Sequence, residues 1–258
     1  MGEQQAIIHA TATSPAVAAL PADTVALISL GATEQHGPHL PLAMDTVLGE
    51  AFARRVAAMV NAPVLIYPTI PFGLSDHHRD FAGTVTVSEE TLSGVMDACV
   101  GSVLRSGFSR VAMLSGHGGN FAFLKAYRDR LRAEHPGLRV AAFVEIGEMV
   151  DACAAAAAQV GLTSPECDAH AGLFETSVAL HLLGADAVGD FGDLHGYIAA
   201  EPGWTERLFR DGVAGLSMNG IIGDPRGASA AAGEAFLNAI ARRIALQFAA
   251  ELGLELRT

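Results

Sequence analysis

Cysteine, tryptophan and basic residues are all scarce in this chain. Of its 258 residues, three are cysteine and one is tryptophan, and 16 lysines and arginines face 28 aspartates and glutamates, for a formal net charge of −12. Nucleic acids and anionic membranes are bound through basic patches, so this charge argues against both as partners. The three cysteines are unevenly spaced and form no CxxC pair, which indicates a reducing compartment rather than a disulfide framework.

Long apolar runs are also missing. The N-terminal residues show no basic stretch followed by an apolar stretch of the kind that directs export. The Ala-rich segment 152–158 is too short and too interrupted to span a bilayer. We therefore expect a cytoplasmic protein without a membrane partner. Half of the residues are apolar and 17% are charged, which is enough for a large buried core.

Four short and almost continuous apolar runs predict buried strands, at residues 24–30, 64–67, 110–114 and 138–144. Segments with helical spacing lie between and after them, at 45–60, from Ser88 onward, at 120–134 and at 231–252. Alternation of strand and helix predicts βαβ units, a mainly parallel central sheet and a three-layer α/β/α sandwich. No linker or internal repeat divides the chain, so we expect a single domain over residues 1–258.

Polar clusters follow three of the predicted strands. Glu34 and His36 come after the first strand, His77 and His78 after the second, and His117 after the third. Parallel sheets bind ligands beyond the carboxyl ends of their strands, so we expect these side chains to converge at one edge. A nicotinamide oxidoreductase could use the same kind of sheet, but no Gly-rich fingerprint follows the first strand.

The segment 31–45, GATEQHGPHLPLAMD, is rich in side chains that bind metals. Carboxylate and imidazole are ligands that zinc, manganese and iron accept. Glu34 and His36 are two residues apart, a spacing that puts both on one face of an extended segment. Asp45 lies at the predicted start of a helix, so capping that helix is one role for its carboxylate and bridging two ions is another. The two roles can coexist.

Two further segments carry candidate site residues. His117 is surrounded by glycines in SGHGGN (115–120), which allow the backbone to approach a ligand closely. The segment DAHAGLFETS (168–177) contains His170, a candidate for proton transfer near neutral pH, and Glu175, a candidate metal ligand. Helix-start chemistry is the alternative reading of this second segment.

Five segments in the same order resemble the creatininase (creatinine amidohydrolase) family. They are GATEQHGPHLPL (31–42) with Asp45, GLSDHHRDFAGT (73–84), SGHGGN (115–120), HAGLFETS (170–177) and GIIGDP (220–225). Any one of these segments alone would be weak, whereas five in register are specific.

The resemblance implies a three-layer α/β/α fold, a centre of two divalent ions (zinc, manganese or iron) and association into homo-oligomers, commonly hexamers. By the same resemblance, Glu34, His36, Asp45 and His117 match metal ligands, with Asp45 as the bridge. Creatininase has a further Glu ligand two residues after the His that matches His117, and this chain has Gly119 there. Glu175 is the best substitute for that ligand, and His170 matches the family's acid/base His.

Substrate class follows less directly from the resemblance. Creatininase covers creatinine with tryptophans, whereas this chain has only Trp204, away from the matching segments, so creatinine is not the expected substrate. Similar patterns occur in a formamidopyrimidine deformylase, in a peptidase that trims a peptide-derived redox-cofactor precursor, and in a keto-inositol hydrolase. The sequence does not choose among these.

We therefore expect a metal-dependent hydrolase that cleaves a C–N amide bond, cyclic amide or formamide in type, in a small molecule. Metal-bound water, with a pKa near 7 on zinc, would supply the attacking hydroxide. His170 would protonate the departing nitrogen, and His78, with His77, would orient the substrate. His39 is expected to hold a ligand in position. Two alternatives stay open: a metallopeptidase acting on a small precursor peptide, and an inactive protein that binds metal or a small molecule.

Overall fold

A parallel sheet forms the centre of the protein. The computed structural model describes residues 6–163, 168–199 and 201–257, and Cys167 lies outside these ranges, while Cys99 and Cys153 are free thiols. Within the described residues the strand order is β1-β3-β2-β4-β5, and all neighbouring strands are parallel. The strands are β1 (Ile7–Ile8), β2 (Val25–Leu30), β3 (Val64–Ile66), β4 (Arg110–Ser115) and β5 (Arg139–Ala142).

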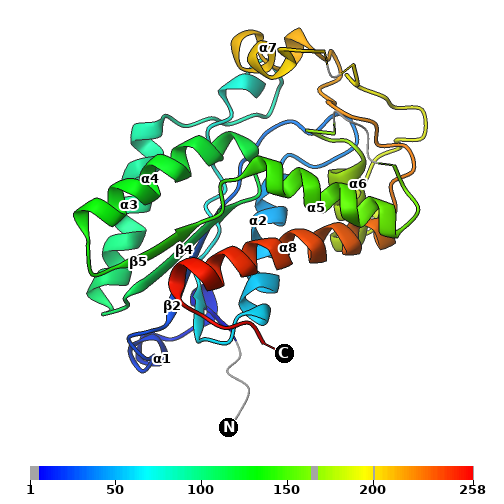
Figure 1. Cartoon of the computed structure of the whole chain (residues 1–258). Helices are drawn as coiled ribbons and strands as arrows, with labels where there is room; N and C mark the ends of the chain where they lie inside the picture. Colours follow the sequence, from blue (N-terminus) through cyan, green and yellow to red (C-terminus); the bar gives the residue numbers. More distant parts are fainter. Residues whose placement is uncertain (1–5, 164–167, 200, 258) are drawn as a thin grey trace.

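Helices cover both faces of this sheet, as Figure 1 shows. They are α1 (Ser14–Ala18), α2 (Met44–Met59), α3 (Glu89–Arg105), α4 (Phe121–Glu134), α5 (Ile146–Gln159), α6 (Leu173–Leu182), α7 (Trp204–Asp211) and α8 (Ala230–Leu252). Alternate residues of β2 separate the two layers of the core. Val25 and Leu27 pack with α2, α5, α6 and α8, whereas Ala26 and Ile28 pack with α3 and α4. The predicted α/β/α sandwich is confirmed.

The predicted strands and helices are found, with small shifts at their ends. The strand expected at 138–144 is shorter, and the helix expected at 45–60 begins and ends one residue earlier. Asp45 does not cap that helix: Ala43 occupies the N-cap position without a side-chain bond, and Asp45 lies in the first turn. The capping prediction is wrong because the Asp45 side chain turns toward histidines instead of toward backbone amides.

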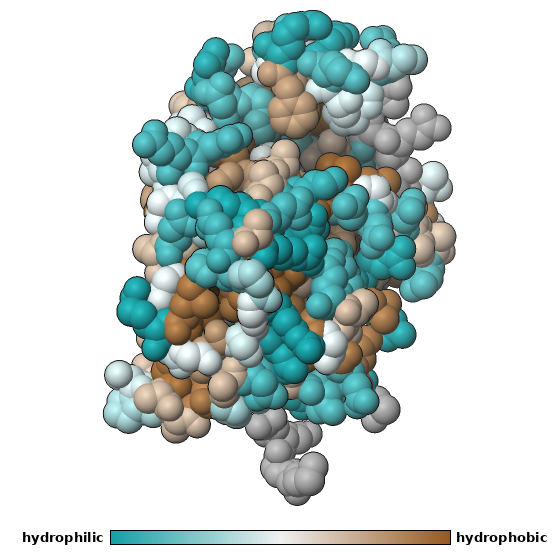
Figure 2. All heavy atoms as spheres, turned by 60° about the vertical axis from the view of Figure 1, so that its left-hand side comes forward, coloured by the Kyte–Doolittle hydropathy of each residue, from teal (hydrophilic) through white to brown (hydrophobic). Residues whose placement is uncertain are grey.

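Both chain ends lie away from the carboxyl ends of the strands, and α7 lies at the opposite end of the molecule (Figure 1). None of the described helices is long and apolar enough to cross a membrane. The face shown in Figure 2 is mostly hydrophilic, with apolar areas between the polar side chains. Sequence reasoning did not predict β1, α1, α5 or α7. β1 is only two residues long, which is too short for a periodic pattern.

Candidate metal centre

Loops that leave three adjacent strands are tied together behind the centre by Asn120. Its side-chain nitrogen donates to the carbonyl of Gly31 (3.0 Å) and to the Ser115 hydroxyl (3.1 Å), and its oxygen accepts from the amide of Leu74 (3.0 Å). These partners follow β2, end β4 and follow β3, respectively. Asn120 is fully buried. Its bonds hold the three loops at the carboxyl edge of the sheet, where the sequence predicted convergence.

Glu34, Asp45 and His117 form one half of the centre. Nδ1 of His117 lies 3.2 Å from Oε1 of Glu34 and 3.3 Å from Oδ2 of Asp45. Glu34 comes from the loop after β2, Asp45 from the first turn of α2, and His117 from the loop after β4. All three side chains are buried. Three ligand-type atoms from three segments thus face a common point.

His36 and Glu175 form the other half with the second oxygen of Asp45. Nε2 of His36 lies 3.3 Å from Oδ1 of Asp45 and 3.6 Å from Oε2 of Glu175. Glu175 belongs to the first turn of α6, where its Oε2 also accepts a hydrogen bond from the amide of Ala171. The two oxygens of Asp45 therefore face two different histidines. This is the arrangement that a carboxylate bridging two ions requires.

These distances fit a metal better than they fit direct hydrogen bonds. Two ligands of one zinc ion, each about 2.1 Å from it at a tetrahedral angle, are separated by about 3.4 Å. Hydrogen bonds from N–H to a carboxylate are shorter, about 2.7–2.9 Å. Among the described residues, both carboxylate oxygens of Glu34, Oδ2 of Asp45 and Nε2 of His36 are buried without a hydrogen-bond partner. Buried polar atoms left this way are costly, and divalent cations in the two halves of the centre would provide their missing partners.

Backbone carbonyls orient His36 and His117 for ligation. Nδ1 of His36 donates to the carbonyl of Glu34 (3.1 Å), and Nε2 of His117 donates to the carbonyl of Leu74 (3.2 Å). A carbonyl oxygen only accepts, so in the neutral imidazole the hydrogen is on the distant nitrogen and the lone pair on the other nitrogen faces the carboxylates. Metal-binding histidines are held in this way.

The buried carboxylates and histidines of the centre shift one another's pKa values. Burial lowers the pKa of His36, but the carboxylates of Asp45 and Glu175 outweigh it and raise that pKa well above 6.5. Burial likewise opposes protonation of His117, and Glu34 and Asp45 raise its pKa well above 6.5. Burial would raise the pKa of Asp45, yet the two histidines hold it well below its usual range. The centre concentrates negative charge that needs cations, either protons or metal.

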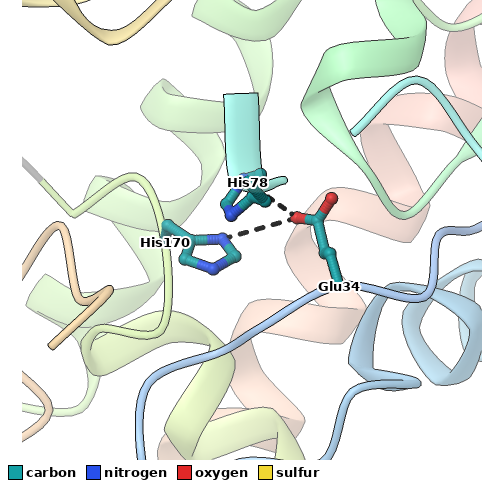
Figure 3. Close-up of side chains that lie close together, drawn as sticks. All are labelled: Glu34, His78 and His170. Carbon is teal, nitrogen blue, oxygen red and sulfur yellow. Dashed lines mark ion pairs between the residues drawn. The ribbon is translucent and has the colours of Figure 1, made fainter. Parts of the chain in front are cut away.

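His78 and His170 also lie beside the carboxylate of Glu34, as Figure 3 shows. Oε1 of Glu34 is 3.2 Å from Nε2 of His78 and 3.8 Å from Nδ1 of His170. Burial lowers the pKa of both histidines, and His36 lowers that of His170 further. Both are therefore neutral imidazoles near pH 7. The structure brings together all seven residues predicted for the site, namely Glu34, His36, Asp45, His78, His117, His170 and Glu175.

His77 and His39 are placed differently. The ring of His77 stacks on that of His117 with centroids 5.5 Å apart. It also contacts the ring of Phe209 in α7, tilted, with centroids 5.2 Å apart. Nε2 of His39 pairs with the hydroxyl of Thr176 at 2.8 Å. Any support that His39 gives to a ligand is thus indirect, through the helix that carries Glu175.

Gln35 is a residue of the candidate site that sequence reasoning missed. Its buried side-chain nitrogen lies 2.9 Å from Nδ1 of His78, 3.0 Å from Nε2 of His170 and 3.1 Å from the carbonyl of Gly220. Gly220 adopts a φ of 80°, and a Cβ there would lie 1.9 Å from Oε1 of Gln35. This contact gives the GIIGDP segment its role: it closes the site around Gln35. The only sequence signal was the position of Gln35 between two predicted ligands.

Asp168 anchors the segment that carries His170 and Glu175. Its two carboxylate oxygens accept hydrogen bonds from the amides of Leu173 (2.8 Å) and Phe174 (3.0 Å), at the start of α6. Burial raises the pKa of Asp168 to about 7, although these amides lower it. The backbone of His170 is paired with Ile222 in both directions, at 3.0 and 2.8 Å. Glu175 and His170 are therefore held from two sides.

The sequence model of creatinine amidohydrolases (Creatininase) matches residues 10–247. The chain belongs to the creatininase family. A mycofactocin precursor peptide peptidase of Mycobacterium tuberculosis (strain CDC 1551 / Oshkosh) is 36% identical over 231 residues, which cover 85% of this chain and 84% of that protein. A creatinine amidohydrolase of Pseudomonas putida is 30% identical over 107 residues, 40% of each chain.

Solved creatininase structures share the fold. W174F mutant creatininase, Type II, superposes with a TM-score of 0.74 at 24% identity, covering 96% of this chain and 99% of that one. The structure named Creatininase Mn gives a TM-score of 0.71 at 24% identity, with the same coverage. The chain is thus a creatininase-family amidohydrolase with the family's α/β fold. The resemblance predicted from five sequence segments is confirmed.

Proposed function

We propose that this protein hydrolyses a C–N bond with two divalent ions held by Glu34, His36, Asp45, His117 and Glu175. The observation that carries the proposal is the position of Asp45, whose two oxygens lie 3.3 Å from two different histidines in a buried cluster. Zinc and manganese both accept this set of imidazole and carboxylate ligands. The name Creatininase Mn associates manganese with a protein of the same fold. Ions bound here would supply an activated water and polarise the substrate's carbonyl oxygen.

Protein groups around the ions would exclude water and orient the substrate. Glu34, Asp45 and His36 are almost completely buried, so electrostatic interactions in the centre are weakly screened. His78 and His170 lie within 4 Å of Glu34 and are the predicted catalytic histidines. Gln35 holds His78 by a hydrogen bond to Nδ1, which directs Nε2–H of His78 into the site.

A short precursor peptide is the substrate class that we favour. The relative that matches 85% of this chain is a mycofactocin precursor peptide peptidase, whereas the creatinine amidohydrolase matches 40%. Trp204, the chain's one tryptophan, packs against Tyr197 with ring centroids 6.3 Å apart and is not among the residues of the metal centre. The peptidase that was an alternative from sequence thus becomes the first choice. A cyclic amide is the second, because the creatinine amidohydrolase shares part of the chain.

Product analysis tests the proposal. Protein loaded with zinc or manganese would be incubated separately with a mycofactocin precursor peptide, with creatinine and with a formamide, and the products identified by mass spectrometry. We expect cleavage of the peptide. Cleavage of creatinine alone would assign the second substrate class, and no turnover by protein that holds two ions would indicate an inactive binding protein.

A matched pair of variants distinguishes the loss of a carboxylate in the centre from the loss of a carboxylate at the surface. Glu34→Gln removes a buried negative charge from the cluster, and Glu50→Gln makes the same change at an exposed position of α2. Glu34→Gln should abolish turnover and lower the zinc content, and Glu50→Gln should change neither. Equal loss in both variants would contradict the assignment. A homo-oligomer and a cytoplasmic location remain predictions, and light scattering on the purified protein tests the first.

A further inference from the structure

The side-chain amide of Gln35 can be oriented in only one way. Its Oε1 accepts a hydrogen bond from the backbone N–H of Gly37 at 2.9 Å, and a backbone N–H only donates. Its nitrogen lies 3.1 Å from the carbonyl oxygen of Gly220, which only accepts. The two contacts agree, so the nitrogen with its two hydrogens faces His78 and His170. Gly220 uses one hydrogen, which leaves one for the two histidines.

The backbone of Gln35 decides which histidine receives that hydrogen. Nε2 of His170 lies 2.6 Å from the backbone carbonyl oxygen of Gln35, so Nε2 carries the hydrogen of this neutral ring. A ring nitrogen that carries a hydrogen cannot accept one. The remaining hydrogen of the amide therefore goes to Nδ1 of His78, at 2.9 Å. His78 must then carry its own hydrogen on Nε2.

The two neighbouring rings thus present opposite groups to the centre (Figure 3). His170 presents the lone pair of Nδ1, which lies 3.8 Å from Oε1 of Glu34 and 4.0 Å from Oε2 of Glu175. His78 presents Nε2–H. Although this nitrogen lies 3.2 Å from Oε1 of Glu34, both oxygens of Glu34 are without a hydrogen-bond partner. The hydrogen is therefore directed past the carboxylate and is available to a substrate atom.

A fixed N–H of this kind suits the hydrolysis of an amide. Attack on the carbonyl carbon moves negative charge onto the carbonyl oxygen, and preoriented donors in a buried site stabilise that charge. A neutral imidazole serves as such a donor in other enzymes. His78 is 2% exposed and Gln35 is 5% exposed, so water does not compete strongly for the contact between them.

We propose that Gln35 is a positioning residue that sets opposite tautomers in His78 and His170. His78 then serves, through Nε2–H, as a fixed hydrogen-bond donor to the carbonyl oxygen of the substrate. His170 keeps the acid/base role predicted from the sequence, through the lone pair of Nδ1. The roles in the reaction rest on the hydrolysis proposed above, whereas the tautomers do not depend on it.

Neutron diffraction from deuterium-exchanged crystals of the zinc-loaded wild type tests the tautomers directly. We expect deuterium on Nε2 of His78 and on Nε2 of His170, and none on Nδ1 of either ring. Deuterium on Nδ1 of His78 would overturn the proposal. This measurement needs neither a variant nor a substrate. Crystals without zinc would contradict the two-ion centre, while the hydrogens of the two rings would still be read in the same map.

Gln35→Glu reverses the contact with His78 without changing the length of the side chain. An ionised carboxylate only accepts hydrogen bonds, so Nδ1 of His78 should carry the hydrogen in this variant and Nε2 should present its lone pair. On the substrate that the wild type cleaves, kcat should fall by about 10²–10³-fold, the usual cost of losing one donor to a developing oxyanion. KM should change less. An unchanged tautomer of His78 in this variant would contradict the proposal.

A double-mutant cycle shows whether Gln35 acts through His78. In a His78→Ala background, Gln35→Glu should have little further effect on kcat, because residues that act as one unit are not additive. Gln159→Glu is the matched control, because it makes the same change at an exposed position of α5 and should alter neither kcat nor the tautomers. An equal loss from Gln35→Glu in both backgrounds would indicate a purely structural role and overturn the proposal.

Discussion

At the scale of single residues, the candidate centre combines buried carboxylates with histidines. Protons and metal ions would compete for the nitrogens of these histidines. Asp45 contacts His36 through one oxygen and His117 through the other, both at 3.3 Å. In the metal-free protein these histidines have pKa values raised well above 6.5. Their protonated forms stabilise the fold below about pH 6.5, and that contribution is lost as the pH rises through the raised pKa values.

Zinc binding should therefore release protons. At pH 6 both His36 and His117 are protonated in the metal-free protein, and a histidine must be neutral to bind metal, so loading should expel about two protons per chain. Zinc affinity should fall as the pH is lowered, because protons compete for the same nitrogens. Calorimetric titration with zinc in two buffers of different ionisation enthalpy measures the number released.

The His36→Ala variant should release about one proton fewer than the wild type. His135→Ala should behave as the wild type, because His135 lies outside the cluster. A wild type that releases no protons at pH 6 would contradict the raised pKa values of the two histidines.

Residue types indicated the candidate ligands but not the groups that orient them. Glu34, His36, Asp45, His117 and Glu175 were predictable because carboxylates and imidazoles follow strand ends or open a helix. Gln35 was not, because an amide has no metal-binding signature and its partners His170 and Gly220 are 135 and 185 positions away. Tautomers were unpredictable for the same reason, since backbone carbonyls set them.

At the scale of secondary-structure elements, the position of Glu175 depends on how α6 packs against α8. Gly233 of α8 lies so close to α6 that a Cβ there would be 2.1 Å from the carbonyl oxygen of Ser177. Ser177 is two residues beyond Glu175 on the same helix. The close approach of these helices fixes the distance between α6 and the rest of the centre.

Gly233→Ala should separate α6 from α8 and destabilise the protein. Overpacking of this kind costs about 1–3 kcal/mol, and each kcal/mol lowers the melting temperature by about 2–4 °C in proteins near this size. Zinc affinity should fall as well, because Glu175 moves with α6. Thermal unfolding and zinc titration of the variant measure the two effects.

Gly94→Ala is the matched control for the same substitution in another helix. Gly94 is exposed in α3, and a Cβ there would meet nothing within 4 Å. Its replacement should stabilise the protein by about 0.5–1 kcal/mol, since glycine is a poor helix residue. Zinc affinity unchanged in Gly233→Ala would contradict the coupling of the helix contact to the metal centre.

Strands with continuous apolar runs and helices with regular apolar spacing were predictable from the sequence. Elements that depend on tertiary packing were not. The core strands β2 and β4 and the helices α2, α4 and α8 match the predicted segments within a residue or two. α5 is rich in alanine and has few buried residues, so its apolar face was hard to recognise. α7 lies between Gly203 and Gly212, both at positive φ, in a segment for which no helix was predicted.

At the scale of the whole molecule, three carboxylates of the described part of the chain are buried in a protein whose net charge is −12. Among the described residues, the groups closest to Glu34, Asp45 and Glu175 are histidines. In the described part of the chain, the salt-bridge partners of these three carboxylates include no lysine or arginine. The stability of the fold should therefore respond strongly to divalent cations.

Removal of metal should lower the melting temperature. An ion present at 100 times its dissociation constant stabilises the folded state by about 2.7 kcal/mol per site, which corresponds to roughly 5–10 °C for a protein near this size. Thermal unfolding would be followed with zinc and with a chelator at the same pH. Identical melting temperatures would contradict a metal centre within the fold, and the shift should be smaller in Glu34→Gln than in Glu50→Gln.

The order of the residues along the chain determines when each part of the centre can form during synthesis. Chains emerge from the ribosome N-terminus first, at roughly 5–20 residues per second. Glu34, Asp45 and His117 emerge early, in the part of the chain that runs from β2 to the loop after β4. Glu175 emerges later, and α6 gains its support only when α8, which ends at Leu252, has been made and packed. In the proposed two-ion centre, a nascent chain could capture the first ion, whereas the second would be acquired only after synthesis.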